Sequence, residues 1–515
     1  MGMTVGRIFE MTAAKFPNKE AYYDSRKDKH LTYRGWHQEV HALANAFLAA
    51  GVKKGDRIST CLYNTEEMGT SYFACAMIGG VFNPINFRLT AEETAFILED
   101  AEPKIVLFEE ATRQVIEAVR MRFPHISFWF IDQDTPSFAK SYQAEMKGAV
   151  IKEITVDVDE NDLYAIMYTS GTTGRPKGVM HSHRDAAEQS LLCIAATGIT
   201  SKDCGLAAAP MFHCAELHCA FLPRVHAGAS HVFLHQFDPG RLLRLIESEK
   251  VSMLFAAPAM WNMILQEDLE IHSVRSLRLG LYGAAPMAPA LVRACRDRLG
   301  IKLVQAYGMT EMGPAISFLS DEDQIEKSGS AGQAALNHEI RIVKPAEDGP
   351  SNPEQTLPPY ETGEIIVRGP CMMSGYYNRE EASREAVYKG WYHSGDLGYL
   401  DEDGFLYIKD RLNDMIISGG ENIYPREVED LLYEHPDVLE AAVIGEPHDL
   451  WGESVTAIIV KKDQNLTAET LEDFCKNSTR LANYKRPRSY IFLNSLPRNA
   501  SGKILKYQIR QEIKR

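Results

Sequence analysis

The sequence predicts an α/β protein: a large N-terminal domain of two doubly wound α/β subdomains plus a β-barrel subdomain, followed by a small α+β C-terminal domain. Three observations predict this. Strand-like and helix-like segments alternate over residues 4–165 and again over 200–320, which is typical of doubly wound sheets. From about residue 330 to 409 the pattern changes to short β segments separated by turn residues. The chain of 515 residues is also too long for one compact core.

The first α/β segment contains both the apolar spacing of a helix and the short apolar runs of buried strands. Apolar residues between positions 36 and 47 recur at helical spacing, and Gly51 follows as a stop signal. Residues 56–62, 104–108 and 127–131 are short apolar runs that predict buried strands. None of these elements carries chemistry by itself.

The second α/β segment repeats this style with five expected strands. They are residues 205–209, 231–234, 252–256, 277–282 and 302–306. Several end in loops of small or functional residues. Because ligands of open α/β sheets bind at the carboxyl ends of the strands, we expect the functional residues in these loops.

The remaining segments predict the β-barrel subdomain and the C-terminal domain. Residues 339–343 and 363–369 are expected strands, and Asp403-Gly404 is a hairpin turn. A run of charges at 407–414 marks the boundary, so we place one domain at 1–410 (α/β subdomains 1–330, β-barrel 331–410) and a second at 411–515. Within the second domain we expect helices at 426–435 and 471–481 and strands at 438–445 and 454–460.

Composition narrows the class of protein. The hydrophobic content of 45% and charged content of 24% are those of a soluble globular protein. A formal net charge of −15 argues against nucleic acid or an anionic membrane as a partner. The nine cysteines form no CxxC pattern, and neither a signal peptide nor a transmembrane run is evident. We therefore expect a cytoplasmic protein, whose oligomeric state stays open with a homodimer as one possibility.

One glycine- and hydroxyl-rich stretch organises the chain. Residues 163–168 predict a buried strand, and the loop after it is suited to surround phosphate oxygens with backbone N–H groups, hydroxyls and one ammonium group. It is not a Walker A loop, because Pro176 and Gly178 break that pattern. A flexible surface loop is the alternative. The candidate phosphate-binding residues are Thr169, Ser170, Gly171, Thr172, Thr173, Gly174 and Lys177.

The full string, YTSGTTGRPKGVM, closely resembles the phosphate-loop signature of the adenylate-forming superfamily. That superfamily includes acyl-CoA synthetases, adenylation domains of peptide synthetases and luciferases. The resemblance implies a reaction in two halves, in which the small C-terminal domain is mobile and alternates between two positions. It extends over essentially the whole chain, and the family's other motifs follow in order.

The loop at residues 209–219 contains His213, Cys214, His218 and Cys219, which raises a metal site as an alternative. Their spacing matches no usual zinc pattern, so a wall of an apolar substrate pocket fits better. The resemblance assigns to His213 a substrate-lining and gating role. Many relatives carry glycine where this chain has Glu216, which leaves the shape of the acyl pocket open.

Two further loops suit a nucleotide. Small residues after a strand allow a flat ring to lie against the backbone, and the resemblance places adenine at Gly283, Ala284 and Ala285. Next comes a match to the family's YGxTE motif. There Tyr307 can stack on a purine beside Gly308, Thr310 can bond a phosphate, and Glu311 can hold Mg²⁺.

The last motifs lie in the barrel and the C-terminal domain. The resemblance makes Asp396 the acceptor of two ribose hydroxyls and Arg411 a second ribose or phosphate contact, although Asp396 could instead cap a turn. By the same resemblance, Asn413 takes the hinge position, where relatives usually carry Lys or Asp. The resemblance also implies that Gly420 lines the pantetheine tunnel for coenzyme A. Lys503 is the adenylation lysine by resemblance, against the alternative of a solvated surface lysine.

The resemblance therefore implies an ATP-dependent, Mg²⁺-requiring acyl-CoA synthetase, an acid–thiol ligase that we expect to activate a medium- or long-chain carboxylate as acyl-AMP. Coenzyme A is favoured as acceptor because no carrier-protein domain follows Lys503. Three alternatives stay open. They are an aryl or short-chain carboxylate–CoA ligase, a stand-alone enzyme that loads an acyl carrier protein, and a non-enzymatic ATP sensor.

Overall fold

A computed structural model describes residues 2–150, 152–169, 176–285, 287–346, 349–418, 421–448, 451–478, 481–498 and 504–513. The chain divides into two compact units. Unit 1 contains residues 1–339 and 368–392, and unit 2 contains residues 340–367 and 393–515. Each unit is described by itself.

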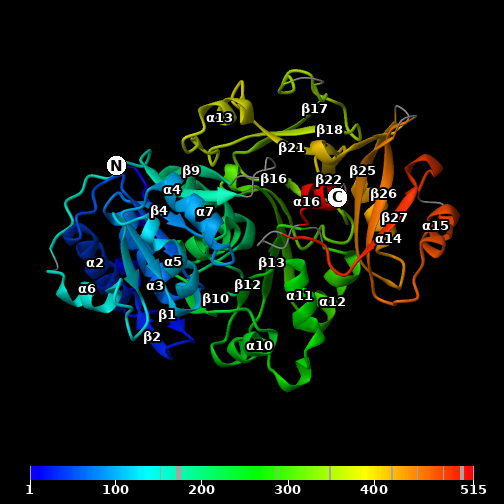
Figure 1. Cartoon of the computed structure of the whole chain (residues 1–515). Coiled ribbons are helices and arrows are strands. Elements are labelled where there is room, and N and C mark those ends of the chain that lie inside the picture. Colours follow the sequence, from blue (N-terminus) through cyan, green and yellow to red (C-terminus); the bar gives the residue numbers. More distant parts are fainter. Residues whose placement is uncertain are drawn as a thin grey trace. The chain divides into compact units, whose positions relative to one another are not determined.

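Unit 1 contains a nine-stranded sheet whose middle strands are parallel (Figure 1). Antiparallel strands cover both edges. In spatial order the strands are β16 (Gln333–Ala334), β15 (Ala315–Leu319), β14 (Lys302–Gly308), β13 (Leu279–Gly283), β12 (Met253–Phe255), β10 (Cys204–Ala207), β11 (Ser230–Phe233), β1 (Glu20–Asp24) and β2 (Lys29–Thr32). The five strands expected between residues 205 and 306 all belong to it.

A second sheet of eight strands belongs mainly to the first half of unit 1. Its parallel part consists of β7 (Lys140–Ser141), β6 (Ser127–Phe130), β5 (Ile105–Phe108), β3 (Arg57–Cys61), β4 (Val81–Pro84) and β8 (Leu163–Thr169). Two antiparallel strands, β9 (Lys177–Ser182) and β19 (Gly375–Tyr376), complete it next to β8. The strand order β19-β9-β8 places Lys177 on the central strand of these three.

Helices follow or connect these strands. They are α1 (Val5–Lys15), α2 (Tyr33–Ala49), α3 (Glu66–Met77), α4 (Ala91–Ala101), α5 (Arg113–Val119), α6 (Tyr142–Gly148), α7 (His183–Thr197), α8 (Cys214–Glu216), α9 (Leu222–His226), α10 (Pro239–Ser248), α11 (Pro258–Gln266), α12 (Pro289–Leu299) and α13 (Glu380–Ala386). A π-helical turn, Leu217–Phe221, joins α8 to α9.

The largest core of unit 1 joins α1, α2 and α3 to strands of both sheets. Trp36 is fully buried at its centre, with ring centroids of Phe9, Tyr22 and Phe73 at 5.0, 5.3 and 5.4 Å. Its indole N–H donates to Thr70 Oγ1 at 3.0 Å, so the buried donor is satisfied. The helical spacing between positions 36 and 47 therefore marked the buried face of α2 correctly.

Two further sheets involve unit 2. One has the order β17 (Glu339–Val343), β18 (Gly363–Arg368), β21 (Trp391–Leu400), β20 (Val387–Tyr388), with β22 (Leu406–Arg411) also paired to β21. The expected β-barrel is thus a half-barrel. The expected turn at Asp403-Gly404 does join β21 to β22, and Gly404 takes a φ of +80° there.

The second of these sheets belongs to the α+β C-terminal part (Figure 1, orange to red). It contains β24 (Glu421–Ile423), β23 (Ile416–Ser418), β26 (Gly452–Lys461), β25 (Val438–His448) and β27 (Ser489–Leu493). The helices are α14 (Pro425–Leu432), α15 (Ala468–Asn477) and α16 (Lys506–Ile513). Val428, Leu432 and Leu471 pack with Val443 and Ile459 in its core. The predicted α/β class is therefore confirmed.

All nine cysteines are free thiols. Among the described residues, no helix combines the length and apolar character needed to cross a membrane.

Candidate active site

Lys177 is the first residue of β9 and pairs with Thr169, the last residue of β8, in an antiparallel hairpin. The candidate loop residues Ser170, Gly171, Thr172, Thr173 and Gly174 lie between them, outside the described residues. The ammonium group of Lys177 lies 4.9 Å from the ring centroid of Tyr376 on the neighbouring strand β19. A cation over an aromatic face is attracted to it, so Tyr376 gives the Lys177 side chain a preferred position.

Thr310 and Glu311 lie on a 3₁₀ turn, Thr310–Met312, that follows β14. Gly308 begins this connection, and a Cβ at that position would lie 1.8 Å from the carbonyl oxygen of Pro314. Only glycine allows this close backbone approach. Gly313 ends the turn with a φ of +98°, again a conformation that favours glycine.

Buried polar groups fix the backbone of this turn. His181 Nε2 donates to the carbonyl oxygen of Thr310 at 2.6 Å, and Met373 N donates to that of Glu311 at 2.8 Å. Cys214 Sγ lies 3.2 Å from Thr310 Oγ1. The turn is therefore held from β9, from α8 and from the segment before β19.

The Glu311 side chain has its own partner, because the hydroxyl of Tyr376 donates to Glu311 Oε1 at 2.9 Å. Burial and the nearby Glu311 carboxylate raise the pKa of Tyr376, so its hydroxyl keeps its proton and acts as a donor. Since the same ring faces Lys177, one tyrosine contacts both a candidate phosphate ligand and a candidate Mg²⁺ ligand.

His213 joins the same cluster through Cys214. Its Nδ1 accepts from the backbone N–H of Ala215 at 3.2 Å, which leaves the proton of the neutral ring on Nε2. Burial lowers the pKa of His213 to about 4, so the ring is uncharged at neutral pH. Burial also raises the pKa of the Cys214 thiol to about 12, which excludes a thiolate there near pH 7.

The metal alternative for this loop finds no support in the geometry. Groups of His, Cys, Asp and Glu with suitably close ligand atoms occur in three other places among the described residues. None of these groups contains His213, Cys214, His218 or Cys219.

The candidate adenine loop follows β13. Gly283 pairs with Ala306 of β14, and a Cβ at Gly283 would lie 2.6 Å from the Ala306 carbonyl oxygen. Ala284 has a φ of +64°, and both Ala284 and Ala285 are exposed. Because β13 and β14 are parallel, this loop and the half-buried Tyr307 lie at the same edge of the sheet. The arrangement leaves a small-residue surface on which a flat ring can lie.

In unit 2, Asp396 and Arg411 lie opposite each other on β21 and β22. Arg411 Nε contacts Asp396 Oδ1 at 2.6 Å. Asp396 is buried, and Arg411 is about one-third exposed. Asn413 lies on the 3₁₀ turn Leu412–Asp414 that follows β22. Gly420 and Lys503 lie outside the described residues.

Glu216 does not present a free carboxylate. Both Glu216 and its ion-pair partner Arg224 are fully buried, and they lie on either side of the π-helical turn. A Cβ at Gly205 would lie 2.1 Å from Arg224 Cδ, so this glycine makes room for the arginine. Burial raises the pKa of Glu216 to about 7, and Arg224 opposes that rise.

Three residues that contact Thr310 or Glu311 were not predicted from the sequence. They are His181, Cys214 as a partner of Thr310, and Tyr376. His181 and Cys214 are each adjacent to a motif, which is a weak signal. Tyr376 is far from Glu311 in sequence, and its only local signal is the pair of tyrosines after Gly375.

Comparison with known proteins matches this chain along nearly its whole length. The family model of AMP-binding enzymes matches residues 9–377, and that of the AMP-binding enzyme C-terminal domain matches residues 427–503. The chain is 34% identical over 513 residues to the long-chain-fatty-acid–CoA ligase FadD13 of Mycobacterium tuberculosis, covering 99% of this chain and 98% of the relative. It is 37% identical over 487 residues to a feruloyl-CoA synthase of Amycolatopsis, covering 93% and 94% respectively.

Solved structures agree with these relatives. The o-succinylbenzoate-CoA synthetase MenE of Bacillus subtilis, in complex with an acyl-adenylate intermediate, has a TM-score of 0.86 and 34% identity over 98% of this chain and 97% of its own. The same synthetase has been solved with ATP and a magnesium ion. These matches confirm the resemblance to the adenylate-forming superfamily. The chain therefore belongs to the AMP-binding enzyme family and is an acid–thiol ligase of the acyl- or aryl-CoA ligase type.

Proposed function

We propose that this enzyme activates a medium- or long-chain carboxylate with ATP and transfers the acyl group to coenzyme A. In the first half-reaction the carboxylate oxygen attacks the α-phosphorus, and pyrophosphate leaves. In the second half-reaction the CoA thiol attacks the acyl carbonyl, and AMP leaves. The observation that carries this proposal is the cluster in unit 1, where Lys177, Thr310, Glu311 and His213 are joined through Tyr376 and Cys214.

The described residues have distinct roles in this proposal. Lys177 and Thr310 bind phosphate oxygens, and Lys177 supplies a positive charge where negative charge develops. The adenine ring lies on residues 283–285 beside Tyr307. His213 is neutral, so it borders the substrate carboxylate as a hydrogen-bonding wall without ion pairing to it.

Mg²⁺ fits this site, because Glu311 offers a partly exposed carboxylate, and carboxylate oxygens are ligands that Mg²⁺ prefers. Glu311 would hold the ion together with phosphate oxygens, and the ion would neutralise phosphate charge. Tyr376 orients the Glu311 carboxylate by donating to Oε1.

Unit 2 supplies the remaining proposed roles. Asp396 accepts the ribose hydroxyls, and Arg411 both pairs with Asp396 and contacts the ribose or a phosphate. The domain boundary at 410/411, the hinge at Asn413, the pantetheine contact at Gly420 and the adenylation role of Lys503 remain proposals from the resemblance. Domain alternation would exchange Lys503 for the thiol between the two half-reactions.

An aryl carboxylate is the second candidate substrate, and one observation favours it. Phe212, next to His213, packs edge-on against Phe87 at 5.1 Å, and Phe87 stacks on Tyr63 at 3.7 Å between ring centroids. Such an aromatic wall can stack on a substrate ring.

The experiment is a panel of fatty and aryl carboxylates with ATP, Mg²⁺ and free CoA, in which AMP, pyrophosphate and thioester are measured separately. We expect all three products to rise with a medium- or long-chain acid. A strict preference for aryl acids would replace the proposed substrate class, and pyrophosphate without thioester would indicate a carrier-protein acceptor. In the same assay, the Lys503→Ala variant should form no acyl-adenylate. When acyl-adenylate and CoA are supplied instead, this variant should still form the thioester.

We also propose a cytoplasmic location, which the nine free cysteines support because disulfides are rare in that compartment.

A further inference from the structure

The strand that carries Lys177 is held between two others at its first residues. Tyr168 of β8 pairs with Gly178 of β9, and on the other side Tyr377 N donates to the Gly178 carbonyl oxygen at 2.7 Å. The position of Lys177 therefore depends on how β8 and the residues after β19 are fixed.

Gly178 lets a side chain of β8 lie against β9 at this point. A Cβ at Gly178 would lie 3.1 Å from Tyr168 Cζ and 2.7 Å from Ile166 Cγ2. The hydroxyl of Tyr168 donates to Asp100 Oδ2 on α4 at 2.7 Å. Burial, together with this carboxylate, raises the pKa of Tyr168, so the hydroxyl stays protonated as a donor.

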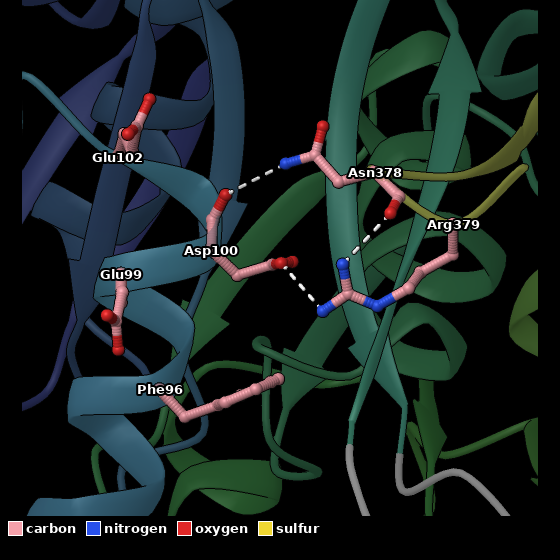
Figure 2. A pocket seen from close by; sticks show the side chains of 6 residues that line it. All are labelled: Phe96, Glu99, Asp100, Glu102, Asn378 and Arg379. Carbon is pink, nitrogen blue, oxygen red and sulfur yellow. Dashed lines mark hydrogen bonds and ion pairs between the residues drawn. The ribbon is translucent and has the colours of Figure 1, made fainter.

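The second oxygen of the same carboxylate contacts the segment after β19. Arg379 Nη2 lies 2.9 Å from Asp100 Oδ1, and Asn378 Nδ2 donates to the Asp100 backbone carbonyl at 3.4 Å. Figure 2 shows the Asp100 side chain directed toward the Arg379 guanidinium. Asp100 thus contacts a residue of β8 and two residues of the segment after β19, and its side chain is only 9% exposed.

The position of Asp100 is unfavourable for α4 alone. The last turn of α4 and its C-cap carry Glu99, Asp100 and Glu102, where the helix dipole disfavours negative charge. Arg379 supplies the compensating charge for Asp100 from a distant part of the sequence. A carboxylate placed against the local preference of its helix indicates that the contact it makes matters elsewhere.

The ion pair of Asp100 with Arg379 lies close in sequence to a residue of the candidate active site. Arg379 follows Tyr376 by three residues, and Tyr376 contacts both Lys177 and Glu311. A shift of the 376–379 segment would therefore move the partner of both side chains, and a shift of Tyr168 would move the strand that pairs with β9.

We propose that Asp100 is a positioning residue for ATP binding: by holding Tyr168 with one oxygen and Arg379 with the other, it fixes β8 and the segment after β19 on either side of Lys177. The inference rests on the proposed role of Lys177 as a phosphate contact. Asp100 itself touches no substrate. It lines a pocket of about 530 Å³ in unit 1 together with Phe96, Glu99, Glu102, Asn378 and Arg379 (Figure 2).

The test compares Asp100→Asn with Glu99→Gln in the full-length enzyme. Both variants replace one carboxylate of the same pocket by its amide, so they change the charge equally. We expect Asp100→Asn to raise the KM for ATP about tenfold, while the KM values for the carboxylate and for CoA change less than twofold. Glu99→Gln should leave all three KM values within twofold of the wild type. A general loss of structure would instead lower the melting temperature and affect all three substrates.

Two more variants make the result decisive. Tyr168→Phe removes only the hydroxyl that reaches Asp100, and its effect on the ATP KM should be non-additive with that of Asp100→Asn. If Asp100→Asn does not fold, Tyr168→Phe decides alone. Lys177→Met separates the inference from the proposed function: an unchanged ATP KM in this variant refutes the phosphate role of Lys177.

If Lys177→Met raises the ATP KM but neither Asp100→Asn nor Tyr168→Phe does so, the inference about Asp100 is wrong and the proposed function stands. Equal losses for ATP, carboxylate and CoA in parallel with a lower melting temperature would also overturn it, because they would assign Asp100 a purely structural role.

Discussion

The hydroxyl of Tyr376 offers the sharpest test of the candidate active site. Tyr376→Phe removes one oxygen atom and keeps the ring that faces Lys177. The ring is buried, so the fold retains its packing. The change removes the hydrogen bond to Glu311 Oε1, which measures 2.9 Å, together with the contact of the same hydroxyl with the Tyr392 side chain.

The magnitude follows from the charge of the acceptor. A hydrogen bond to an ionised group contributes about 1.5–3 kcal/mol, more than a neutral one. If Glu311 must be held in place to bind Mg²⁺ in the transition state, this energy corresponds to a loss of roughly 10- to 150-fold in kcat/KM for ATP. Tyr376→Leu also removes the aromatic face beside Lys177, which adds about 0.5–1 kcal/mol and therefore a further few-fold loss.

The assay is carboxylate-dependent pyrophosphate release from ATP, titrated with Mg²⁺. We expect Tyr376→Phe to raise the half-saturating Mg²⁺ concentration as well as to lower kcat/KM for ATP. Tyr33→Phe is the matched control, because its buried hydroxyl donates to the Ala229 carbonyl oxygen at 2.6 Å away from the candidate site. An unchanged Mg²⁺ dependence in Tyr376→Phe, with activity and stability no different from those of Tyr33→Phe, would refute the link between Tyr376 and Glu311.

Three further predictions concern stability and backbone geometry. Glu216→Ala should lower the free energy of unfolding by about 3–5 kcal/mol, because Arg224 stays buried without its ion-pair partner. The double variant Glu216→Leu with Arg224→Met should recover most of this loss, as measured by urea denaturation. Equal stability of the single and double variants would contradict this prediction. His213 has a pKa lowered to about 4 by burial, below its unfolded value, so the native state binds fewer protons between about pH 4 and 6.5. The stability of the wild type relative to His213→Leu should therefore fall as pH falls through that window, and a flat difference would exclude it. Gly308→Ala should abolish adenylation because its Cβ would meet the Pro314 carbonyl oxygen at 1.8 Å, whereas Gly148→Ala, with open space around its Cβ, should have no effect on activity.

Much of the α/β framework could be predicted because its strands are short apolar runs that end in small or polar residues. The expected strand at 277–282 is β13 (Leu279–Gly283), and the expected strand at 302–306 is β14 (Lys302–Gly308). Parallel strands buried on both faces give this signal without help from distant residues. The half-barrel was less predictable, since strand periodicity alone does not determine whether a sheet closes.

The contacts around the candidate site could not be predicted in the same way. Tyr376 reaches Glu311 only because β19, a strand of two residues, pairs with β9. The ion pair of Glu216 with Arg224 depends on a π-helical turn between them, which changes the spacing that an α-helix would give. Both depend on tertiary packing and not on local pattern. The roles of the 170–174 loop and of Lys503 stay predictions, because these residues lie outside the described part of the chain.

The structure also explains why the sequence identifies the enzyme family but not the carboxylate substrate. Thr310 and Glu311 are fixed by His181, Cys214 and Tyr376, so a change at any of these positions disturbs the groups expected to bind ATP. The aromatic side chains near His213, which are Phe212, Phe87 and Tyr63, contact each other mainly by ring packing. Such packing tolerates a change of side-chain size and shape more readily than a buried hydrogen bond does. Relatives named for a long-chain fatty acid and for ferulate both match this chain at 34–37% identity, so one family fold accommodates different carboxylates.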